Sequence, residues 1–334
     1  MLSKRENLLE TIRGGKPDRF VKQFEGTAMV PGDPVNFYVR GNRFPGMEPL
    51  LDRWGTRILW PAGEPGAVPD PAVKPLHDIT EWKEVVKIPD LIANADAAEL
   101  WEPYLERAAA VNRDEDYFMM FAPTGIFERL HFIHGFEDTL MDFLIEPEFM
   151  ADLCMAIGEY RYNGYKLMVE HAHPEMMLAH DDWGSKTSLF VPPDSWREIM
   201  KPAYKKGYDY LHEQGVIIMH HADSFCEEIV EDMIDLHIDV WQGVLPQNDI
   251  VKLQKIINGR MCLMGGIDAA IVDRDDSTEE EIRAETRRVC ETYAVNGSFI
   301  PCITYGGAGC IHHSTDVFID DEIEKCSNEF FGKK

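Results

Sequence analysis

The chain has 334 residues, long enough for one large α/β barrel or for two domains of ordinary size. Hydrophobic residues make up 45% of it and charged residues 28%, a composition typical of compact globular proteins rather than disordered or collagen-like chains. Acidic residues outnumber basic ones by 59 to 33, and the net charge of −26 repels nucleic acid and anionic lipid surfaces. We therefore expect neither nucleic acid nor a membrane surface as a partner.

The N-terminal segment, the short apolar runs and the cysteines indicate a cytoplasmic protein. The first segment, MLSKRENLLETIRGG, is charged and amphipathic and lacks the apolar core of a secretory signal. Apolar runs such as VIIM at 216–219 fall far short of the ~20 residues that cross a bilayer. The seven cysteines are scattered, form no CxxC pair and are expected to be reduced, so any metal would need ligands from distant segments.

The first 115 residues are irregular. An N-terminal helix is followed by a candidate first strand, VKQFE at 21–25. A stretch rich in proline and glycine then extends over 31–75, and we expect an elaborated loop there.

After residue 115, apolar runs of strand length alternate with amphipathic stretches of helix length, as parallel β/α units do. A long helix is predicted from Pro147 to Ala172, and STEEE is a capping signature at the start of a helix over 278–293. The predicted strands are YFMMF at 117–121, MMLA at 176–179, VIIM at 216–219, DVW at 239–241, CLMG at 262–265 and FIPC at 299–302.

The alternation favours a single (β/α)8 TIM barrel over the whole chain, 1–334, with an elaborated N-terminal region at 1–115 and regular β/α units at 116–334. About seven strands are identifiable, without a clear eighth. The alternative, a doubly wound sheet, lacks support because neither a GxGxxG nor a GxxxxGK[ST] loop follows any strand.

Polar residues gather where the predicted strands end. In parallel α/β proteins these ends converge on one face, which is where chemistry is placed. The candidate residues at strand ends are Glu25; His180, Asp181 and Asp182; His221 and Asp223; Trp241 and Gln242; and Cys302 and Tyr305.

The strand end HHADS suggests a metal site. Because side chains alternate along a strand, His221 and Asp223 point the same way, while His220 faces the helical layer or a neighbouring strand. With a thiolate from Cys302 in a later strand, the pair would form a mixed N/O/S zinc site. Alternatively, His-x-Asp is a hydrogen-bonded pair that orients a loop, and the cysteine is a small buried hydrophobe.

The aspartates of AHDDWG have two interpretations. One of them could supply a fourth ligand or a general base, or Asp before Trp-Gly could cap the following helix. Parity with His180 favours Asp182 as the residue that points inward.

A second thiol and imidazole cluster lies in the glycine-rich segment GGAGCIHH. Cys310, His312 and His313 lie within four residues of one another, and Cys310 is an alternative thiolate ligand to Cys302.

Four motifs, in order along almost the whole chain, resemble the uroporphyrinogen decarboxylase (URO-D) superfamily. They are RENLLETIRGGKPDRF, AHDDWGSKTSLFVPPDSWREIMKPAYK, HHADS and LMGGID. The resemblance implies a TIM barrel, in agreement with the β/α alternation. The decarboxylases proper carry an arginine-rich RQAGR segment near the first strand, where this chain has VKQFEGTAMVPGD, which counts against a porphyrinogen substrate.

The other branch of the superfamily comprises cobamide-dependent methyltransferases, in which a His-x-Cys pair and a later cysteine hold zinc. Here His221-Ala222-Asp223 has aspartate in place of the first cysteine. An oxygen-richer zinc site is a stronger Lewis acid toward an oxygen atom. This resembles the methyltransferase component of anaerobic O-demethylases, which move methyl groups from methoxylated aromatics to a corrinoid protein.

The resemblance implies zinc-dependent transfer of a methyl group from a small methyl ether to cob(I)alamin on a partner corrinoid protein, and an aryl methyl ether is the expected donor. His221, Asp223 and Cys302 are the expected zinc ligands, and Asp182 and Tyr305 the proton or orientation residues. Glu25, Trp241 and Gln242 are expected in the substrate pocket, which should contain few cations. The sequence leaves open whether the protein forms a homodimer.

Two other functions remain. One is a metal-free decarboxylase of a smaller acid, in which Asp182 would stabilise a developing cation. The other is a barrel without catalytic activity that only binds a tetrapyrrole or corrinoid partner, suggested by Asp223 where the methyltransferases have cysteine.

Overall fold

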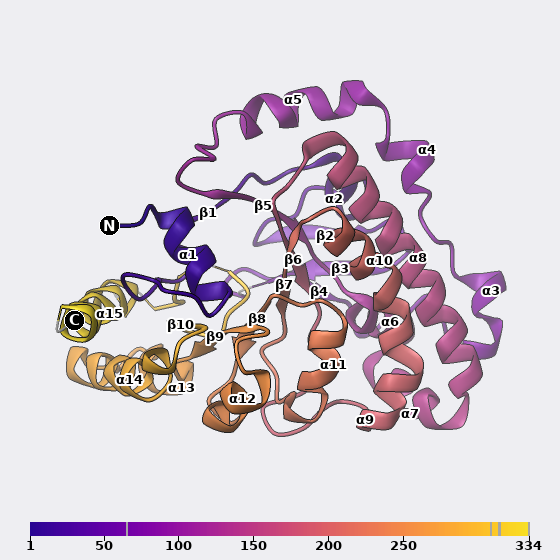
Figure 1. Cartoon of the computed structure of the whole chain (residues 1–334). Helices are drawn as coiled ribbons and strands as arrows, with labels where there is room; N and C mark the ends of the chain where they lie inside the picture. The colour runs from indigo at the N-terminus through magenta and orange to yellow at the C-terminus, as the bar shows by residue number, and fades with distance from the viewer. Residues whose placement is uncertain (65, 308, 313–314, 333–334) are drawn as a thin grey trace.

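A computed structural model describes residues 1–64, 66–307, 309–312 and 315–332 of the chain. Its centre is a seven-stranded sheet in which every neighbouring pair is parallel (Figure 1). The strand order is β1-β5-β6-β7-β8-β9-β10, so that successive strands are neighbours from β5 onward. The strands are β1 (Thr27–Met29), β5 (Tyr117–Ala122), β6 (Met176–His180), β7 (Ile217–His221), β8 (Val240–Val244), β9 (Cys262–Gly266) and β10 (Phe299–Cys302).

The inner face of the sheet has its own core, as expected when a sheet curls into a barrel. Alternate residues of six strands meet there, and side chains of helix α1 (Lys4–Ile12) join them. The cluster includes Met119, Leu178, Met219, Val240, Met264 and Ile300 with Leu8 and Ile12. The arrangement is that of a TIM-like barrel.

The outer face of the sheet packs against helices, among which α8 and α10 lie side by side, as do α14 and α15 (Figure 1). Residues that alternate with the inner set, such as Phe118, His220 and Trp241, belong to this outer layer. The elements after β5 are α6 (Ile126–His134), α7 (Phe136–Ile145), α8 (Pro147–Ala172), α9 (Pro193–Ser195), η2 (Trp196–Met200), α10 (Lys201–Glu213), η3 (Glu227–Ile229), α11 (Val230–Asp235), α12 (Ile250–Ile257), α13 (Ala269–Val272), α14 (Glu279–Thr292), η4 (Ala294–Asn296) and α15 (Thr315–Phe331).

The segment at 31–75, expected to be a loop, contains regular structure. A helix and an antiparallel three-stranded sheet of order β2-β3-β4 form there, because short alternating runs such as RILW pair locally although prolines and glycines surround them. The elements before β5 are α2 (Pro34–Arg40), β2 (Met47–Leu51), β3 (Arg57–Trp60), β4 (Val68–Pro69), η1 (Ile79–Glu81), α3 (Trp82–Val85), α4 (Leu91–Ala95) and α5 (Ala98–Ala108).

The predicted first strand at 21–25 is wrong, since β1 begins at Thr27. Phe24 and Gly26 have φ angles of 55° and 77°, in the left-handed region, so the chain turns where a strand was expected. Within the described residues β1 and β10 are the edges of the sheet and do not pair, so a closed eight-stranded barrel is not formed.

The six strands predicted after residue 115 are confirmed, with ends that differ by at most three residues and with identical bounds for the last strand. The two helix predictions are also confirmed: α8 spans Pro147–Ala172, and Thr278 caps α14 through a capping box with Glu281. No helix in the described part of the chain is long and apolar enough to cross a membrane.

Candidate metal centre at the ends of β6 and β7

Three possible metal ligands meet at the carboxyl ends of two adjacent strands. His180 ends β6, Asp182 follows it, and His221 ends β7, and one ligand atom from each lies within 4.8 Å of the others. His221 Nε2 lies 3.6 Å from Asp182 Oδ1, and the two imidazole rings stack with their centroids 4.3 Å apart.

The strand register explains this convergence. His180 is the direct partner of His221 in the parallel ladder, and both follow residues that point into the barrel. His220 points the opposite way, as predicted. Its Nδ1 accepts a 2.6 Å hydrogen bond from the Tyr208 hydroxyl, and its ring stacks on Trp183 in the helical layer.

Gln242, from β8, fixes the orientation of His221. Its amide nitrogen donates to the carbonyl oxygen of Tyr305, so its amide oxygen faces His221 and accepts a hydrogen bond from Nδ1. Burial lowers the pKa of His221 to about 3, which keeps the ring neutral. The lone pair of Nε2 is therefore directed at the site.

Glu128, from α6, holds the second imidazole in the same way. The Nδ1 of His180 donates to Glu128 Oε2 over 3.1 Å, and the same oxygen accepts from the backbone of Gly125. Burial alone would lower the pKa of His180, but the Glu128 carboxylate has the larger effect, and the pKa of His180 is raised to about 9. Burial raises the pKa of Glu128, but the charge of His180 outweighs it and lowers the pKa to about 2.

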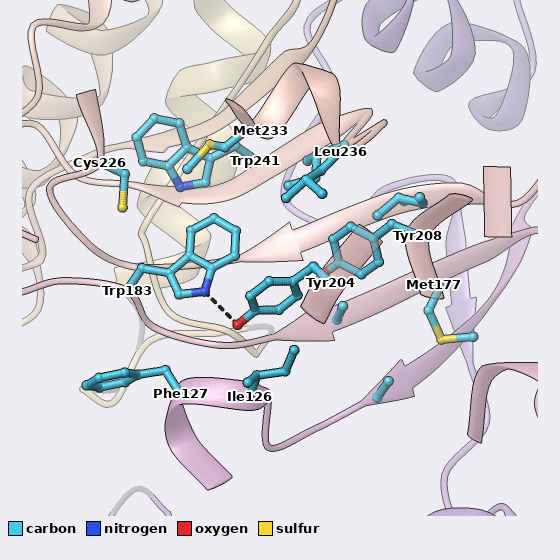
Figure 2. Close-up of a cluster of buried hydrophobic side chains, with 14 of the residues drawn as sticks. Ile126, Phe127, Met177, Trp183, Tyr204, Tyr208, Cys226, Met233, Leu236 and Trp241 are labelled. Atoms are coloured by element: carbon cyan, nitrogen blue, oxygen red, sulfur yellow. Dashed lines mark hydrogen bonds between the residues drawn. The ribbon is translucent and has the colours of Figure 1, made fainter. Parts of the chain in front are cut away.

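Asp181 positions the helix that carries Glu128. Its carboxylate accepts hydrogen bonds from the backbone nitrogens of Phe127 and Glu128, at 2.8 and 2.9 Å, and so caps α6 from another part of the chain. Tyr204 donates to the same carboxylate, and Trp183 donates to the Tyr204 hydroxyl, as Figure 2 shows. Asp181 is thus structural, and it caps α6, which follows β5, rather than the helix after β6.

Two carboxyl groups lie together beside the imidazoles. The backbone nitrogen of Asp223 donates to Asp182 Oδ1 over 2.9 Å. Burial, reinforced by the charge of Asp182, raises the pKa of Asp223 to about 7, and burial also raises that of Asp182. The pair retains a proton near neutral pH, which a bound cation would displace.

Gly306 covers one side of the cluster. A Cβ atom at this position would lie 3.2 Å from His221 Nε2 and 3.1 Å from His180 Cδ2, so only glycine lets the loop after β10 approach the rings this closely. The site still reaches solvent, because the side chains of Asp182 and His180 are 31% and 23% exposed.

The donor set fits zinc. Two imidazole nitrogens and a carboxylate are ligands that zinc takes in catalytic sites with an open fourth position. Each imidazole also has the second-shell partner that such ligands need, Glu128 for His180 and Gln242 for His221. His180, His221 and Asp182 would hold the ion.

The predicted ligands are only partly brought together. His221 belongs to the cluster, and Asp223 lies against Asp182. Cys302 is buried in the inner core among apolar side chains, where burial raises the pKa of its thiol, and it is not part of a potential ligand group in the described residues. Its role as a ligand stays a prediction.

The other predicted site residues lie in different parts of the structure. Asp182 and Gln242 lie at the centre, whereas the Tyr305 hydroxyl lies against the carboxylate of Asp273. Glu25 precedes β1 and accepts a hydrogen bond from the backbone of Lys22. Trp241 lies in the outer core among the buried side chains of Figure 2, and because it alternates with Gln242 it faces away from the centre. The expectation that Trp241 lines the pocket therefore needs correction.

The described part of the glycine-rich segment after β10 makes loop contacts. The backbone nitrogen of Cys310 donates to Asp316, and His312 Nδ1 lies 2.9 Å from Asp275. His313 lies outside the described residues.

Two groups of the centre were missed at the sequence level. His180 is among the candidate residues at strand ends but not among the predicted ligands, although its parity with Asp182 places it inward. Glu128 follows no strand directly, and only the contact of Asp181 with α6 brings it to His180.

Comparisons with known proteins agree with this architecture. Residues 71–304, more than half of the chain, match the family described as uroporphyrinogen decarboxylase (URO-D). Among curated proteins, none matches the chain significantly. A solved structure of a methyltransferase from Methanosarcina mazei superposes with a TM-score of 0.68 at 14% identity, covering 99% of this chain and 100% of that one.

Proposed function

Because the chain belongs to the uroporphyrinogen decarboxylase family, we propose that it is a zinc-dependent methyltransferase that moves a methyl group from an aryl methyl ether to the cob(I)alamin of a partner corrinoid protein. The observation that carries the proposal is the meeting of His180, Asp182 and His221, whose ligand atoms lie within 4.8 Å of one another, while Glu128 and Gln242 engage the Nδ1 atoms of the two imidazoles. The methyltransferase from Methanosarcina mazei, which has the same fold, supports the choice of reaction.

The reaction transfers the methyl group without its bonding electrons. The carbon–oxygen bond of the ether breaks, its electron pair stays on the phenolate oxygen, and the methyl carbon bonds to reduced cobalt. A phenolate, the anion of an acid with a pKa near ~10, is a poor leaving group unless its charge is stabilised. His180, Asp182 and His221 would hold the zinc ion, which would supply Lewis acidity toward that oxygen.

The protein's own groups complete the site. Glu128 and Gln242 each accept a hydrogen bond from the Nδ1 atom of one ring and so leave its Nε2 atom for the metal ion. The backbone nitrogen of Asp223 donates to Asp182 Oδ1 and so orients the third ligand. The exposed side of Asp182 leaves an opening at the end of the sheet where the corrinoid partner would dock.

Metal content tests the proposal. We expect about one zinc per chain after expression with zinc, and a His221→Ala variant that folds but retains less than about 0.1 equivalent. His77→Ala is the control, because His77 is exposed and distant in sequence from the strand ends. A wild-type protein that stays free of zinc, with activity unaffected by chelators, would overturn the zinc mechanism.

A decarboxylase of a small acid is the second candidate. It is favoured by Arg43 and by Arg129 of α6, whose side chains are buried against Asp52, because guanidinium groups are suited to hold a carboxylate. Carbon dioxide release from a small aromatic acid, without methyl transfer and without need of metal, would select this function.

A further inference from the structure

The loop after β10 touches the candidate metal centre in two ways. Gly306 packs against the rings of His180 and His221. Tyr305, the residue before it, accepts a 2.8 Å hydrogen bond at its carbonyl oxygen from the amide nitrogen of Gln242. The position of this loop therefore bears on both imidazoles and on the amide that contacts one of them.

One buried carboxylate holds the loop from outside the centre. Asp273 directly follows α13 and is 8% exposed. Its Oδ2 accepts a hydrogen bond from the backbone nitrogen of Ile311 and its Oδ1 one from that of His312, both at 2.8 Å. The hydroxyl of Tyr305 donates to the same carboxylate. Because hydrogen bonds to a charged acceptor are the stronger ones, Asp273 fixes the loop at Tyr305 and again six residues later.

The Gln242 amide depends on this loop for its orientation. The side chain is fully buried, and its nitrogen donates to the Tyr305 carbonyl while its oxygen accepts from His221 Nδ1. A half-turn of an amide group exchanges its oxygen and nitrogen with little change of shape, so the hydrogen-bond partners decide which way it points. A Tyr305 carbonyl held in place selects the orientation in which the amide oxygen faces His221.

The orientation of the amide in turn decides where His221 carries its proton. A neutral imidazole has one proton, and its location is set by the hydrogen bond that one ring nitrogen makes. With the Gln242 oxygen at Nδ1, the proton stays there and Nε2 has a lone pair for a metal ion. A turned amide would present its nitrogen to Nδ1, move the proton to Nε2 and remove that lone pair.

We propose that Asp273 is a positioning residue of the metal centre, which acts through Tyr305 and Gln242 to keep the proton of His221 on Nδ1. The inference rests on the proposed function for zinc as the bound ion, whereas the location of the proton stands on the hydrogen bonds alone. Asp273 lies between α13 and α14, away from the strand that carries His221, and its effect reaches the ring through the loop after β10.

Magnetic resonance of the metal-free full chain tests the location of the proton directly. In protein labelled with ¹⁵N-histidine, proton–nitrogen correlation spectra distinguish a protonated ring nitrogen from a bare one, and the signals of His221 are those lost in His221→Ala. We expect the wild type to carry the proton on Nδ1. Asp273→Ala should move part of the His221 population to the form protonated on Nε2, an effect that a loss of stability alone would not produce.

Zinc affinity, measured by competition with a colorimetric chelator, gives the second readout. Asp273→Ala should weaken zinc binding about tenfold or more, the range typical of outer partners of metal ligands. In a Gln242→Leu background the same substitution should cause no further loss, because the amide through which Asp273 acts is gone. Asp275→Ala is the matched control: Asp275 contacts His312 of the same loop from a side chain that is 96% exposed, and this variant should match the wild type in both readouts.

A second variant keeps the test valid if Asp273→Ala does not fold, as judged by thermal unfolding without metal. Asp273→Asn has the same shape and keeps one acceptor oxygen, and it should shift the His221 proton and the zinc affinity in the same direction by less. An unchanged His221 proton in a folded variant would overturn the inference. So would an equal loss of zinc affinity in Asp275→Ala, or losses that add in the double variant with Gln242→Leu.

The two readouts separate this inference from the proposed function. A wild type that binds no zinc, but whose His221 proton still moves in Asp273→Ala, would overturn the zinc mechanism and keep the positioning role. Zinc binding and methyl transfer that are both unaffected by Asp273→Ala would keep the proposed function and overturn the inference. A displaced proton together with weakened zinc binding supports both.

Discussion

Replacement of Gly306 by alanine tests whether the metal centre lies between His180 and His221. The added methyl group would lie 3.1 Å from His180 Cδ2 and 3.2 Å from His221 Nε2, closer than the 3.4 Å at which ordinary contacts of a Cβ atom begin. The backbone itself tolerates alanine, because Gly306 is not among the residues with positive φ.

The neighbours of Gly306 cannot easily give way. His221 is 2% exposed and is held by Gln242, and His180 is held by Glu128, so the rings or the loop must shift by a few tenths of an ångström. The methyl group also occupies space beside the two Nε2 atoms. Changes around metal ligands typically lower metal affinity about 10- to 100-fold, which corresponds to roughly 1.4–2.8 kcal/mol, and we expect that range for zinc.

Gly307 provides the matched control, since a Cβ there meets no atom within 4 Å. Competition of each variant with a colorimetric zinc chelator measures affinity, and thermal unfolding without metal measures stability. Gly307→Ala should bind zinc like the wild type, and both variants should unfold within a few degrees of it. Wild-type affinity in Gly306→Ala would refute the placement of the centre, and equal losses in both variants would attribute the effect to the loop.

Three other substitutions have distinct expected results. Arg129→Met leaves the buried charge of Asp52 without its closest cation and should lower the free energy of unfolding by about 3–5 kcal/mol in denaturant titrations. Arg57→Met, at a half-exposed pair, should lower the free energy of unfolding by less than about 1 kcal/mol. Similar losses in both variants would contradict the argument that burial sets the difference. Gln242→Leu should reduce zinc affinity about 10- to 100-fold in the chelator assay, and an unchanged affinity would show that this amide does not orient a ligand. Asp223→Cys should slow methyl transfer from aryl ethers, because a thiolate donates more charge to zinc and weakens its pull on oxygen; faster transfer would exclude a hard, oxygen-rich site.

The regular half of the fold and the direction of the key side chains follow from local sequence. Alternation along MMLAH and VIIMHH places His180 and His221 on the inner face once the strands are parallel, and His220 on the outer face. The same rule, applied to Trp241 and Gln242, would have separated a core residue from the one that contacts His221.

What failed to follow from the sequence depends on tertiary contacts. The position of Glu128 requires Asp181 to cap α6 from a distant strand, and no local pattern encodes that contact. The first strand was misplaced because the turn at Phe24 has a positive φ in a residue that rarely adopts it. Arg129 and Asp52 pair although they lie 77 residues apart, so no local motif predicts this pair.

The central claim is that the two oriented imidazoles and Asp182 hold a zinc ion that serves methyl transfer from an aryl ether. The most direct measurement is a single-turnover reaction of the zinc-loaded protein with 4-methoxybenzoate and cob(I)alamin, followed by the absorbance of the cobalt. The account predicts formation of methylcobalamin with an equal amount of 4-hydroxybenzoate, abolished by chelation and by His221→Ala. No methylcobalamin from zinc-loaded protein, or the same amount after removal of the metal, would contradict it.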